Sequence, residues 1–475
     1  MKRFLALLLA SLLLMSLALT GCKKDDTKEG SNKTDDTQQP PKKVEEVAKE
    51  VEDDPSVKTL NIYAFTDEVP KMLQKYKELN PDFPYEINET IIATTDGLYQ
   101  PALDQALAGG GADAPDIYVV EAAFVLKYCQ GDAYQYAAPY ADLGIDVDRL
   151  LEEAEIAPYT VEIGTNPDGK LVGLGYQATG GAFIYRRSLA KDTWGTDDPE
   201  VIKGKIGPGW DKFFEAAEEL KAKGYAIVSG DGDIWHAVEN SSDQGWVVDG
   251  KLTIDPKREE FLDLSKKLKD NGYHNDTQDW TDAWYADMKG VGEKPVFGFF
   301  GPAWLINYVM AGNSGGEKIG EGTYGDWAVC EPPVGFFWGG SWVLANKDTK
   351  IPKTVGKIIE WITLDYSENG LQYMWANGTF DPESGTKDTV ASGAVMKISN
   401  GEIDFLNGQN MFDAFVPAGE FANGKNLTQY DETINGHFRG QVREYTAGNK
   451  TREQALADFK QLVADNLDVE VDLDN

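Results

Sequence analysis

The stretch Leu60-Asn61-Ile62-Tyr63-Ala64-Phe65 is a short apolar strand, and the elements that follow it decide the fold. An amphipathic helix is expected over residues 70–79, a second strand over 85–92 and a second helix over 97–108. Asp116-Ile117-Tyr118-Val119-Val120 then follows Pro115 and has the composition of a buried strand. This βαβαβ order is typical of a doubly wound α/β sheet.

The remainder of the chain continues the alternation of strands and helices. Residues 173–184 are predicted to form a hairpin or a crossover, and Gly301-Pro302-Ala303-Trp304 a turn into a helix that runs to residue 310. Further strands are expected at 296–300, 327–330 and 342–345, and further helices at 210–223, 355–364 and 452–463. Because residues 57–475 exceed what one core usually covers, we expect two α/β lobes.

The amino-terminal residues have the pattern of a secretory signal. Lys2 and Arg3 precede an apolar run that is too short to span a membrane, and Leu19-Thr20-Gly21-Cys22 follows. This ending resembles the lipobox of bacterial lipoproteins, which predicts a signal peptide over residues 1–21 and a lipid on Cys22. The alternative is an ordinary signal peptide with an accidental cysteine.

The segment after Cys22 is predicted to be a tether. Residues 23–56 are almost all charged or polar, with proline and no apolar periodicity, so they cannot bury enough surface to fold. We therefore expect residues 22–56 to hold the folded part outside the cell membrane of a bacterium, and this length suits a Gram-positive surface. A partner-binding tail is the less favoured interpretation.

Charge and composition exclude several classes of function. The net charge is −34, which argues against a nucleic-acid partner and against an anionic membrane face beyond the lipid itself. Aside from Cys22, the cysteines are Cys129 and Cys330, which we expect to be two buried free thiols; pairing outside the cell is the alternative. No pair of histidines has metal-ligand spacing.

No catalytic motif stands out, so the sequence does not predict an enzyme, a cofactor or a metal. A nucleophile elbow, a phosphate-binding glycine loop and a Ser-x-x-Lys arrangement are all missing. The acidic groups Asp231 with Asp233, and Asp276 with Asp279 and Asp282, could hold calcium. They lack the regular spacing of oxygen ligands found in a calcium-binding loop, so a solvated face is the favoured interpretation.

Six segments in order resemble the carbohydrate-type extracellular solute-binding proteins of ABC importers, which are related in fold to maltose-binding protein. The segments are Leu60 to Leu79, Ala114-Pro115-Asp116-Ile117, Gly209-Trp210-Asp211-Lys212-Phe213-Phe214, Phe300-Gly301-Pro302-Ala303-Trp304, the stretch Gly325 to Pro333, and Gly339-Gly340-Ser341-Trp342. The resemblance implies two α/β lobes, a hinge and a ligand cleft between the lobes. It places lobe one at 57–165 plus 335–380, and lobe two at 166–334 plus 381–475.

Aromatic residues near strand ends are the first candidates for the cleft. A sugar ring can stack on an indole, and open α/β sheets bind ligands beyond the carboxyl ends of their strands. Trp304 lies just past a strand, where the resembling family places a stacking tryptophan, and Trp338 immediately precedes the Gly339-Gly340 turn. Packing in the core is the alternative for both tryptophans.

Polar candidates follow from the same topology. Thr66, Asp67 and Glu68 come after the first strand and Glu121 comes after the strand 116–120, where carboxylates could accept hydrogen bonds from sugar hydroxyls or cap the next helix. The resemblance adds the crossover pair Tyr176 and Gln177, of which Tyr176 would offer its hydroxyl. Trp235 and His236, in an expected loop, would line the cleft or lie in solvent.

The sequence thus predicts a lipid-anchored, monomeric receptor that captures an oligosaccharide and delivers it to an ABC permease. One alternative keeps the fold and binds a polyamine or another cation, because aromatic walls with Asp67 and Glu121 would also suit a cation. The other alternative is a surface enzyme that degrades glycans.

Overall fold

The described part of the chain is built on two sheets. The computed structural model describes residues 46–94 and 97–473, all of which lie in the compact unit Lys43–Asn475. The predicted signal peptide and Cys22, the predicted site of lipid attachment, lie outside the described residues. Among the residues described, no helix is long and apolar enough to cross a membrane.

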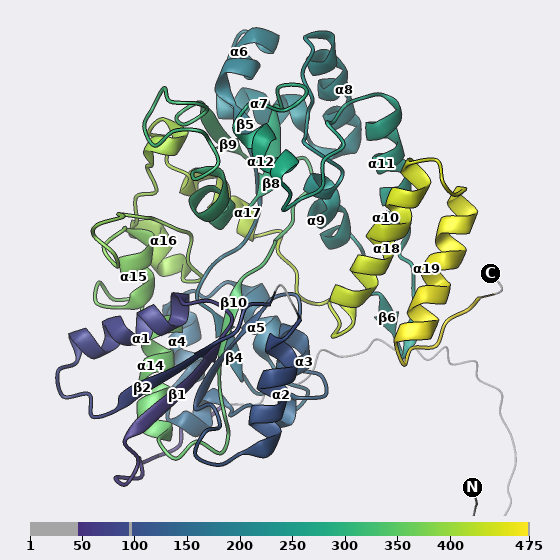
Figure 1. The fold of residues 1–475 in the computed structure, drawn as a ribbon. Coiled ribbons are helices and arrows are strands. Elements are labelled where there is room, and N and C mark those ends of the chain that lie inside the picture. The colour runs from purple at the N-terminus through teal and green to yellow at the C-terminus, as the bar shows by residue number, and fades with distance from the viewer. Residues whose placement is uncertain (1–45, 95–96, 474–475) are drawn as a thin grey trace, which may run out of the picture. The chain divides into compact units, whose positions relative to one another are not determined.

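The first sheet has five strands in the order β2-β1-β3-β10-β4 (Figure 1). Its strands are β1 (Thr59–Ala64), β2 (Glu86–Ile91), β3 (Ile117–Glu121), β4 (Gly173–Gly175) and β10 (Ser341–Ala345). Strands β1, β2 and β3 are parallel, and β10 runs antiparallel to β3 and β4. The predicted βαβαβ start is confirmed.

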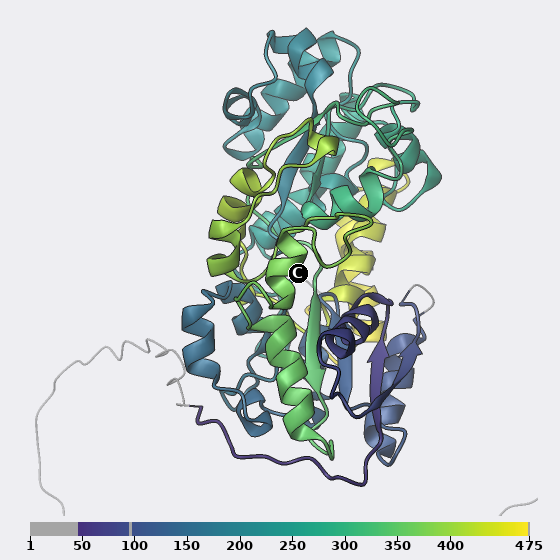
Figure 2. The same cartoon turned by 90° about the vertical axis from the view of Figure 1, so that its left-hand side faces the viewer.

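Helices surround this sheet, and together they form what we call the first lobe. They are α1 (Glu68–Leu79), α2 (Tyr99–Gly109), α3 (Val125–Cys129), α4 (Val147–Glu153), α5 (Pro158–Gly164), α14 (Pro352–Thr363), and the 3-10 turns Tyr134–Tyr136 and Tyr140–Leu143. Side chains alternate along β1, β3 and β10 between two apolar clusters, so these strands are covered on both faces, whereas the edge strand β2 is largely exposed. Helix α14 packs beside β10 (Figure 2).

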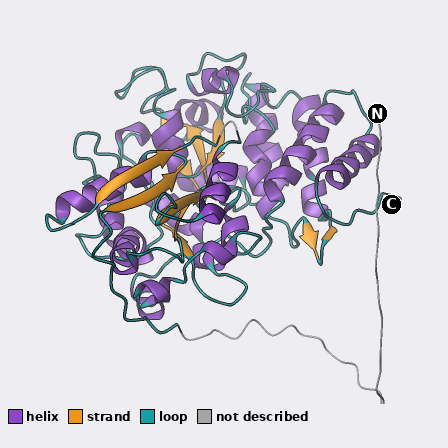
Figure 3. Ribbon diagram, turned by 60° about the horizontal axis from the view of Figure 1, so that its bottom comes forward, coloured by secondary structure: helices purple, strands orange, loops and turns teal. Residues whose placement is uncertain are grey.

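The second sheet has three strands in the order β8-β5-β9, and with its helices forms the second lobe. The strands are β5 (Ala182–Arg186), β8 (Gly298–Gly301) and β9 (Trp327–Cys330). The helices are α6 (Arg187–Trp194), α7 (Pro199–Ile206), α8 (Gly209–Ala222), α9 (Gly232–Asn240), α10 (Pro256–Glu259), α11 (Phe261–Asp270), α12 (Asp282–Met288), α13 (Ala303–Leu305), α18 (Asp431–Thr446) and α19 (Arg452–Asn466). The ribbon β6 (Val247–Val248) and β7 (Lys251–Leu252) stands apart from both sheets (Figure 3).

The remaining elements lie between α14 and α18 in the chain. They are α15 (Leu371–Ala376), α16 (Gly393–Ile398), the 3-10 turn Asp404–Leu406 and α17 (Phe412–Gly419). The helix predicted to run to residue 310 is instead two pieces, because α13 passes into a π-helical turn at Ile306–Met310.

Two chain segments connect the sheets and pair with each other. Residues 176–181 lead from β4 to β5, and residues 331–340 return from β9 to β10. The Gly181 amide donates to the Phe336 carbonyl at 2.8 Å, and the Trp338 amide donates to the Thr179 carbonyl at 3.0 Å. A Cβ at Gly181 would lie 2.0 Å from the Phe336 ring, so this approach requires glycine. The segment 173–184 is a crossover.

The crossover corrects the predicted lobe boundary. Strand β4 pairs with β10 in the first sheet, so the chain leaves the first lobe after Gly175 and not at residue 165. The three-residue strand Gly-Leu-Gly carries no strand propensity of its own, because glycine is depleted in strands. Its pairing with the apolar strand β10 determines where it lies.

The predicted tether also ends earlier than expected. Residues 46–56 have no helix or strand, yet they run along the outside of the first lobe as the dark purple line in Figure 2. The Lys49 amide donates to the Ala141 carbonyl, and the Leu171 amide donates to Glu46. The prediction of a disordered segment is therefore wrong for residues 46–56. These residues have few apolar side chains to bury, and hydrogen bonds to the first lobe hold them in place instead.

The two remaining cysteines are buried free thiols, as predicted. Cys129 lies in the core of the first lobe and Cys330 in the core of the second. Burial raises the pKa of both thiols above their ordinary value, so both stay protonated.

Asp53 joins the amino-terminal segment to helix α14, and we expect its removal to destabilise the fold. Its carboxylate accepts from the Lys353 amide at 2.9 Å and from the Thr354 amide at 3.2 Å, at the first turn of α14. Asp53→Ala is expected to lower the free energy of unfolding by about 1–2 kcal/mol, as the loss of a helix cap does. Urea denaturation measures this change.

Glu52→Ala is the matched control. The Glu52 carboxylate is 84% exposed and pairs with the Lys353 side chain, so its loss is expected to change the free energy of unfolding by less than about 0.5 kcal/mol. Equal effects of the two substitutions would contradict the role of Asp53 as a cap.

Candidate functional site

Four of the predicted residues meet at one edge of the first sheet. Glu68 follows β1, Glu121 ends β3 and Tyr176 follows β4, and these are the carboxyl ends of their strands. Strand β10 begins at this edge because it runs the other way, with Ser341 opposite Glu121. Gly339 therefore lies here too, and its φ of +73° is one that glycine adopts without strain.

An aromatic cluster lies next to this edge, contributed by the second lobe and the returning segment. Trp304 follows β8, and its indole Nε1 donates to the Trp338 carbonyl at 2.9 Å. The Trp304 and Trp338 rings meet edge to face with centroids 4.8 Å apart. The His236 ring stacks on Trp338 with centroids 4.6 Å apart. Trp304 and Trp338 are both half-buried, so each keeps an accessible surface.

A third tryptophan belongs to the cluster, and the sequence prediction missed it. Trp280 is 50% exposed and lies parallel to Trp304, with an interplanar angle of 6° and centroids 6.2 Å apart. Its φ of +66° is rare for a bulky side chain, so the surrounding structure holds it in place. The available signal was a tryptophan directly after the polar segment Asn275-Asp276-Thr277-Gln278-Asp279, where no core residue is expected.

Glu121 lines a cavity of about 180 Å³ that both lobes and the returning segment form. His236, Trp338, Gly339 and Asp431 also line this cavity, which we call the acidic pocket. The Glu121 carboxylate accepts from the Ala123 amide at 2.9 Å, so it braces a local turn and does not cap a helix. Burial, reinforced by the nearby charge of Glu432, raises the pKa of Glu121 to about 7.

Glu68 lines a second cavity of about 180 Å³, together with Asp67, Tyr308 and Trp375. Burial raises the pKa of Glu68, although hydrogen bonds from Tyr176 and Tyr308 oppose that rise. The Tyr176 side chain is 1% exposed and its hydroxyl donates to Glu68, so a ligand here would meet Glu68 and not the Tyr176 hydroxyl. Gln177 is also buried.

Asp67 stands beside this second cavity without capping α1. Its carboxylate makes an exposed ion pair with Lys71 at 2.7 Å, and it accepts no hydrogen bond from the first-turn amides. The carboxylate therefore remains open to solvent and to a ligand.

Trp235 and His236 do not lie in a loop, because they belong to helix α9. Trp235 is 1% exposed and packs between Phe261 and Phe438, so the prediction that it lines the cleft is wrong. Neighbouring residues of a helix point in directions about 100° apart, which sends Trp235 into the core while His236 reaches the pocket.

The acidic groups considered for calcium are partly internal. Asp233 is 7% exposed, accepts from the Ser229 and Gly230 amides and holds the Trp284 indole at 3.0 Å. Asp279 forms an ion pair with Arg439 at 2.7 Å. The prediction of a solvated face is therefore wrong for these two residues, and the described residues contain no cluster able to hold a metal ion.

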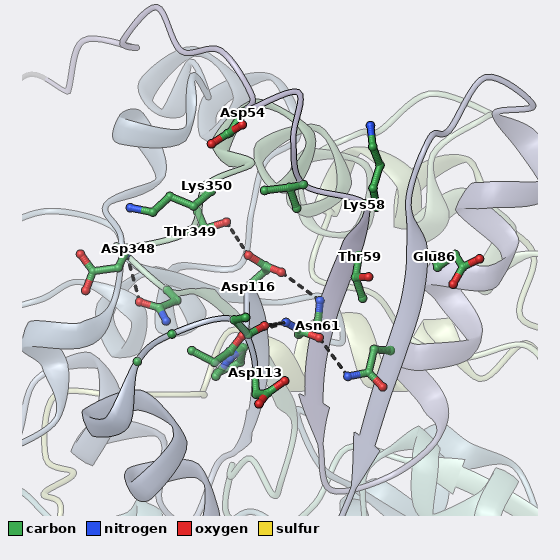
Figure 4. A pocket seen from close by; sticks show the side chains of 18 of the residues that line it. Asp54, Lys58, Thr59, Asn61, Glu86, Asp113, Asp116, Asp348, Thr349 and Lys350 are labelled. Atoms are coloured by element: carbon green, nitrogen blue, oxygen red, sulfur yellow. Dashed lines mark hydrogen bonds between the residues drawn. The ribbon is translucent and has the colours of Figure 1, made fainter.

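A larger cavity lies elsewhere, at the opposite edge of the first sheet (Figure 4). Its volume is about 1060 Å³, and Thr59 and Glu86 mark the amino ends of strands beside it. Asp116 is held there by the Asn61 amide at 2.9 Å and the Thr349 hydroxyl at 2.7 Å. Because no aromatic side chain lines it and its strands begin there, this cavity fits a sugar less well than the opposite edge.

Comparison with known proteins identifies a family and a fold. Residues 71–397 match the family model described as bacterial extracellular solute-binding protein. No curated relative matches the chain. Among solved structures, an extracellular solute-binding protein of family 1 is 19% identical with a TM-score of 0.67, over 86% of this chain and 100% of that chain.

Two further solved structures carry sugars. The galacto-N-biose/lacto-N-biose I-binding protein of the ABC transporter from Bifidobacterium longum, in complex with lacto-N-biose, is 16% identical with a TM-score of 0.64, over 88% of this chain and 100% of that chain. The ABC transporter associated binding protein from B. animalis subsp. lactis, in complex with β-1,6-galactobiose, is 18% identical with a TM-score of 0.59, over 86% of this chain and 97% of that chain. The predicted two-lobed α/β fold is confirmed.

The raised pKa of Glu121 predicts a stability difference that depends on pH. A carboxyl group whose pKa rises from 4.5 to about 7 on folding favours the fold below pH 4.5, and that contribution is lost as the pH rises through about 7. Glu121→Gln is therefore expected to raise the free energy of unfolding by about 1–2 kcal/mol at pH 8, after allowance for the partial exposure of Glu121. Urea denaturation at pH 4 and pH 8 measures it.

At pH 4 the same substitution is expected to have little effect, because Glu121 is then protonated when folded. Glu368→Gln, which removes an exposed carboxylate, serves as the control. It should not change the free energy of unfolding at pH 4 or at pH 8. A gain for Glu121→Gln that is equal at both pH values would show that the charge is not responsible.

Proposed function

Because this chain belongs to the family of bacterial extracellular solute-binding proteins, we propose that it is the substrate-binding component of an ABC importer and that its ligand is a carbohydrate. The observation that carries this proposal is the cluster of Trp280, Trp304 and Trp338, of which Trp338 lines the same cavity as the Glu121 carboxylate. The sugars bound by the two Bifidobacterium proteins support the same ligand class.

The chemistry of the cluster suits a sugar. Indole faces stack on the C–H faces of a pyranose, while carboxylates accept hydrogen bonds from its hydroxyls and fix its orientation. The half-exposed ring of Trp280 and the partly accessible rings of Trp304 and Trp338 offer such faces. Three indoles side by side favour an oligosaccharide over a single sugar.

Binding would couple to closure of the lobes. Glu121 belongs to the first lobe and His236 to the second, so a ligand in contact with both is held fully only when the lobes are close. The paired segments 176–181 and 331–340 are the proposed hinge. A permease that recognises the closed form would then receive the loaded protein.

The proposed location is the outer face of a cell membrane. The lipobox-like ending at Cys22 supports a lipid anchor there, and the polar residues after it would act as a tether up to about residue 45. A Gram-positive source and a monomeric state remain parts of this proposal. Because the chain belongs to a family of solute-binding proteins, the alternative of a glycan-degrading enzyme is disfavoured.

Removal of the Trp280 ring is expected to weaken binding without harming the fold. Trp280→Ala should lower affinity for a bound disaccharide by roughly 10–100-fold, the loss of one stacked ring, measured by isothermal titration with lacto-N-biose and β-1,6-galactobiose. Because the ring is 50% exposed, the free energy of unfolding should change by about 0.5 kcal/mol or less.

Tyr366→Ala is the matched control, since Tyr366 is a 38% exposed aromatic residue outside the cluster. It should leave affinity unchanged. Full affinity in Trp280→Ala and in Trp304→Ala would exclude the aromatic cluster as the binding site. If the unmodified protein bound none of the sugars, that result would count against a carbohydrate ligand.

A further inference from the structure

The acidic pocket carries more negative charge than a neutral sugar requires. The carboxylates that line it come from both lobes, and they belong to Glu121, Glu239, Asp431 and Glu432. Neither lysine nor arginine lines this pocket. Hydrogen bonds to sugar hydroxyls need acceptors, but carboxylates in one pocket also repel one another, as Glu432 does Glu121 and Glu239 does Asp431, so the arrangement favours a positively charged occupant.

Asp431 supplies a second, independent observation. This side chain is 6% exposed, and its Oδ1 accepts from the Thr428 hydroxyl while its Oδ2 is buried with no hydrogen-bond donor. A buried carboxylate oxygen without a donor is strongly unfavourable, and most such atoms in proteins find a partner. The pocket beside Asp431 is the place from which a ligand could supply that donor.

The cation nearest to these carboxylates does not satisfy them. Arg258 is 1% exposed, its guanidinium lies over the Trp246 ring at 4.7 Å, and its Nη1 donates to the Gln244 carbonyl at 2.9 Å. Its charge lies close enough to influence Glu239 and Asp431. One buried guanidinium cannot neutralise four carboxylates, and it donates to neither Asp431 oxygen in the described structure.

Glu239 already has side-chain partners, whereas Asp431 Oδ2 has no donor and the donor to Glu121 is a backbone amide. The Glu239 carboxylate meets the His236 Nδ1 at 3.2 Å and accepts from the Asn435 amide. The stacked rings of His236 and Trp338 form one wall of the pocket. An indole face beside carboxylates attracts ammonium groups through cation–π contact.

We infer that the acidic pocket binds an ammonium group of the ligand, so that the carbohydrate is an amino sugar with a free, protonated amine. The ammonium would donate to Asp431 Oδ2 and to Glu121, while the ring to which it is attached stacks on the neighbouring tryptophans. This inference rests on the proposed function and narrows its ligand class. Because Glu121 and Asp431 lie on different lobes, the ammonium would also bridge them.

Binding of the ammonium should release protons from the carboxyl groups of the acidic pocket. Burial raises the pKa of both Glu121 and Asp431 to about 7, with Glu432 adding to the rise at Glu121 and Glu239 adding to it at Asp431. Arg258 opposes the rise at Asp431. An ammonium binds the ionised carboxylates, so its affinity should increase as the pH rises from 5.5 to 7, whereas that of a neutral sugar should not.

The test is isothermal titration of the full-length protein with matched sugars at pH 7. The probes are the β-1,4-linked dimer of glucosamine, the corresponding dimer of galactosamine, their N-acetylated forms and putrescine. We expect one free-amine dimer to bind at least about tenfold more tightly than its N-acetylated form, and that ratio to fall at least about tenfold between pH 7 and pH 5.5.

Asp431→Asn and Glu121→Gln keep the side-chain shapes and should each lower affinity for the amine at least about fivefold, whereas Glu368→Gln should not. The pH dependence of the unmodified protein gives an answer even where a variant fails to fold. Equal or tighter binding of the N-acetylated dimers would overturn the inference and leave the proposed function standing. Binding of putrescine without any sugar would overturn both and support a polyamine receptor, and no binding of any probe would overturn the inference.

Discussion

The pairing of the two segments that cross between the sheets is the constraint on which the rest of the structure depends. Hydrogen bonds between Gly181 and Phe336 and between Trp338 and Thr179 hold residues 176–181 against residues 331–340. Tyr176 and Trp338 lie on these segments, so the same pairing that connects the lobes also places the hydroxyl that donates to Glu68 and the ring that forms one wall of the acidic pocket. A side chain at Gly181 would overlap the Phe336 ring, and one at Gly180 would lie 2.7 Å from the Gly419 backbone.

Several carboxyl groups near the carboxyl ends of the strands have raised pKa values. Burial raises the pKa of Glu68, and it raises that of Glu121 and Asp431 to about 7. It does the same for Asp388, a buried residue close enough to Glu68 for their charges to interact. Each such group is unfavourable for folding above neutral pH, because its charged form loses hydration. Perturbed carboxyl groups of this kind are typical of functional sites. Burial also raises the pKa of Asp116 at the opposite edge of the first sheet, although both of its carboxylate oxygens have donors there.

Strong local patterns explain what the sequence could predict. The apolar strands at β1, β3 and β10 and the amphipathic helices α8, α14 and α19 each carry their own periodicity, so their existence was evident. The order of these elements led to the two-lobed fold and to Glu68, Glu121, Trp304 and Trp338 at strand ends. The sheet to which Gly173–Gly175 belongs was not predictable, because only its partner β10 determines it.

Side-chain direction and long-range contacts account for the other misses. Trp235 and His236 are neighbours in sequence, yet α9 turns one into the core and the other toward the pocket. Trp280 has a left-handed backbone that no local pattern indicates. Residues 46–56 are ordered by partners such as Ala141 and Lys353, which lie far along the chain.

The most direct test of the central claim, that a carbohydrate binds at the three tryptophans, is a titration followed by tryptophan emission. The full-length protein would be titrated with lacto-N-biose, β-1,6-galactobiose and the amino-sugar dimers, beside the triple variant Trp280→Phe, Trp304→Phe, Trp338→Phe. A saturable change in emission is expected with at least one sugar, and this change should be lost in the triple variant. An unchanged emission with every sugar, or a change that persists in the triple variant, would contradict the claim.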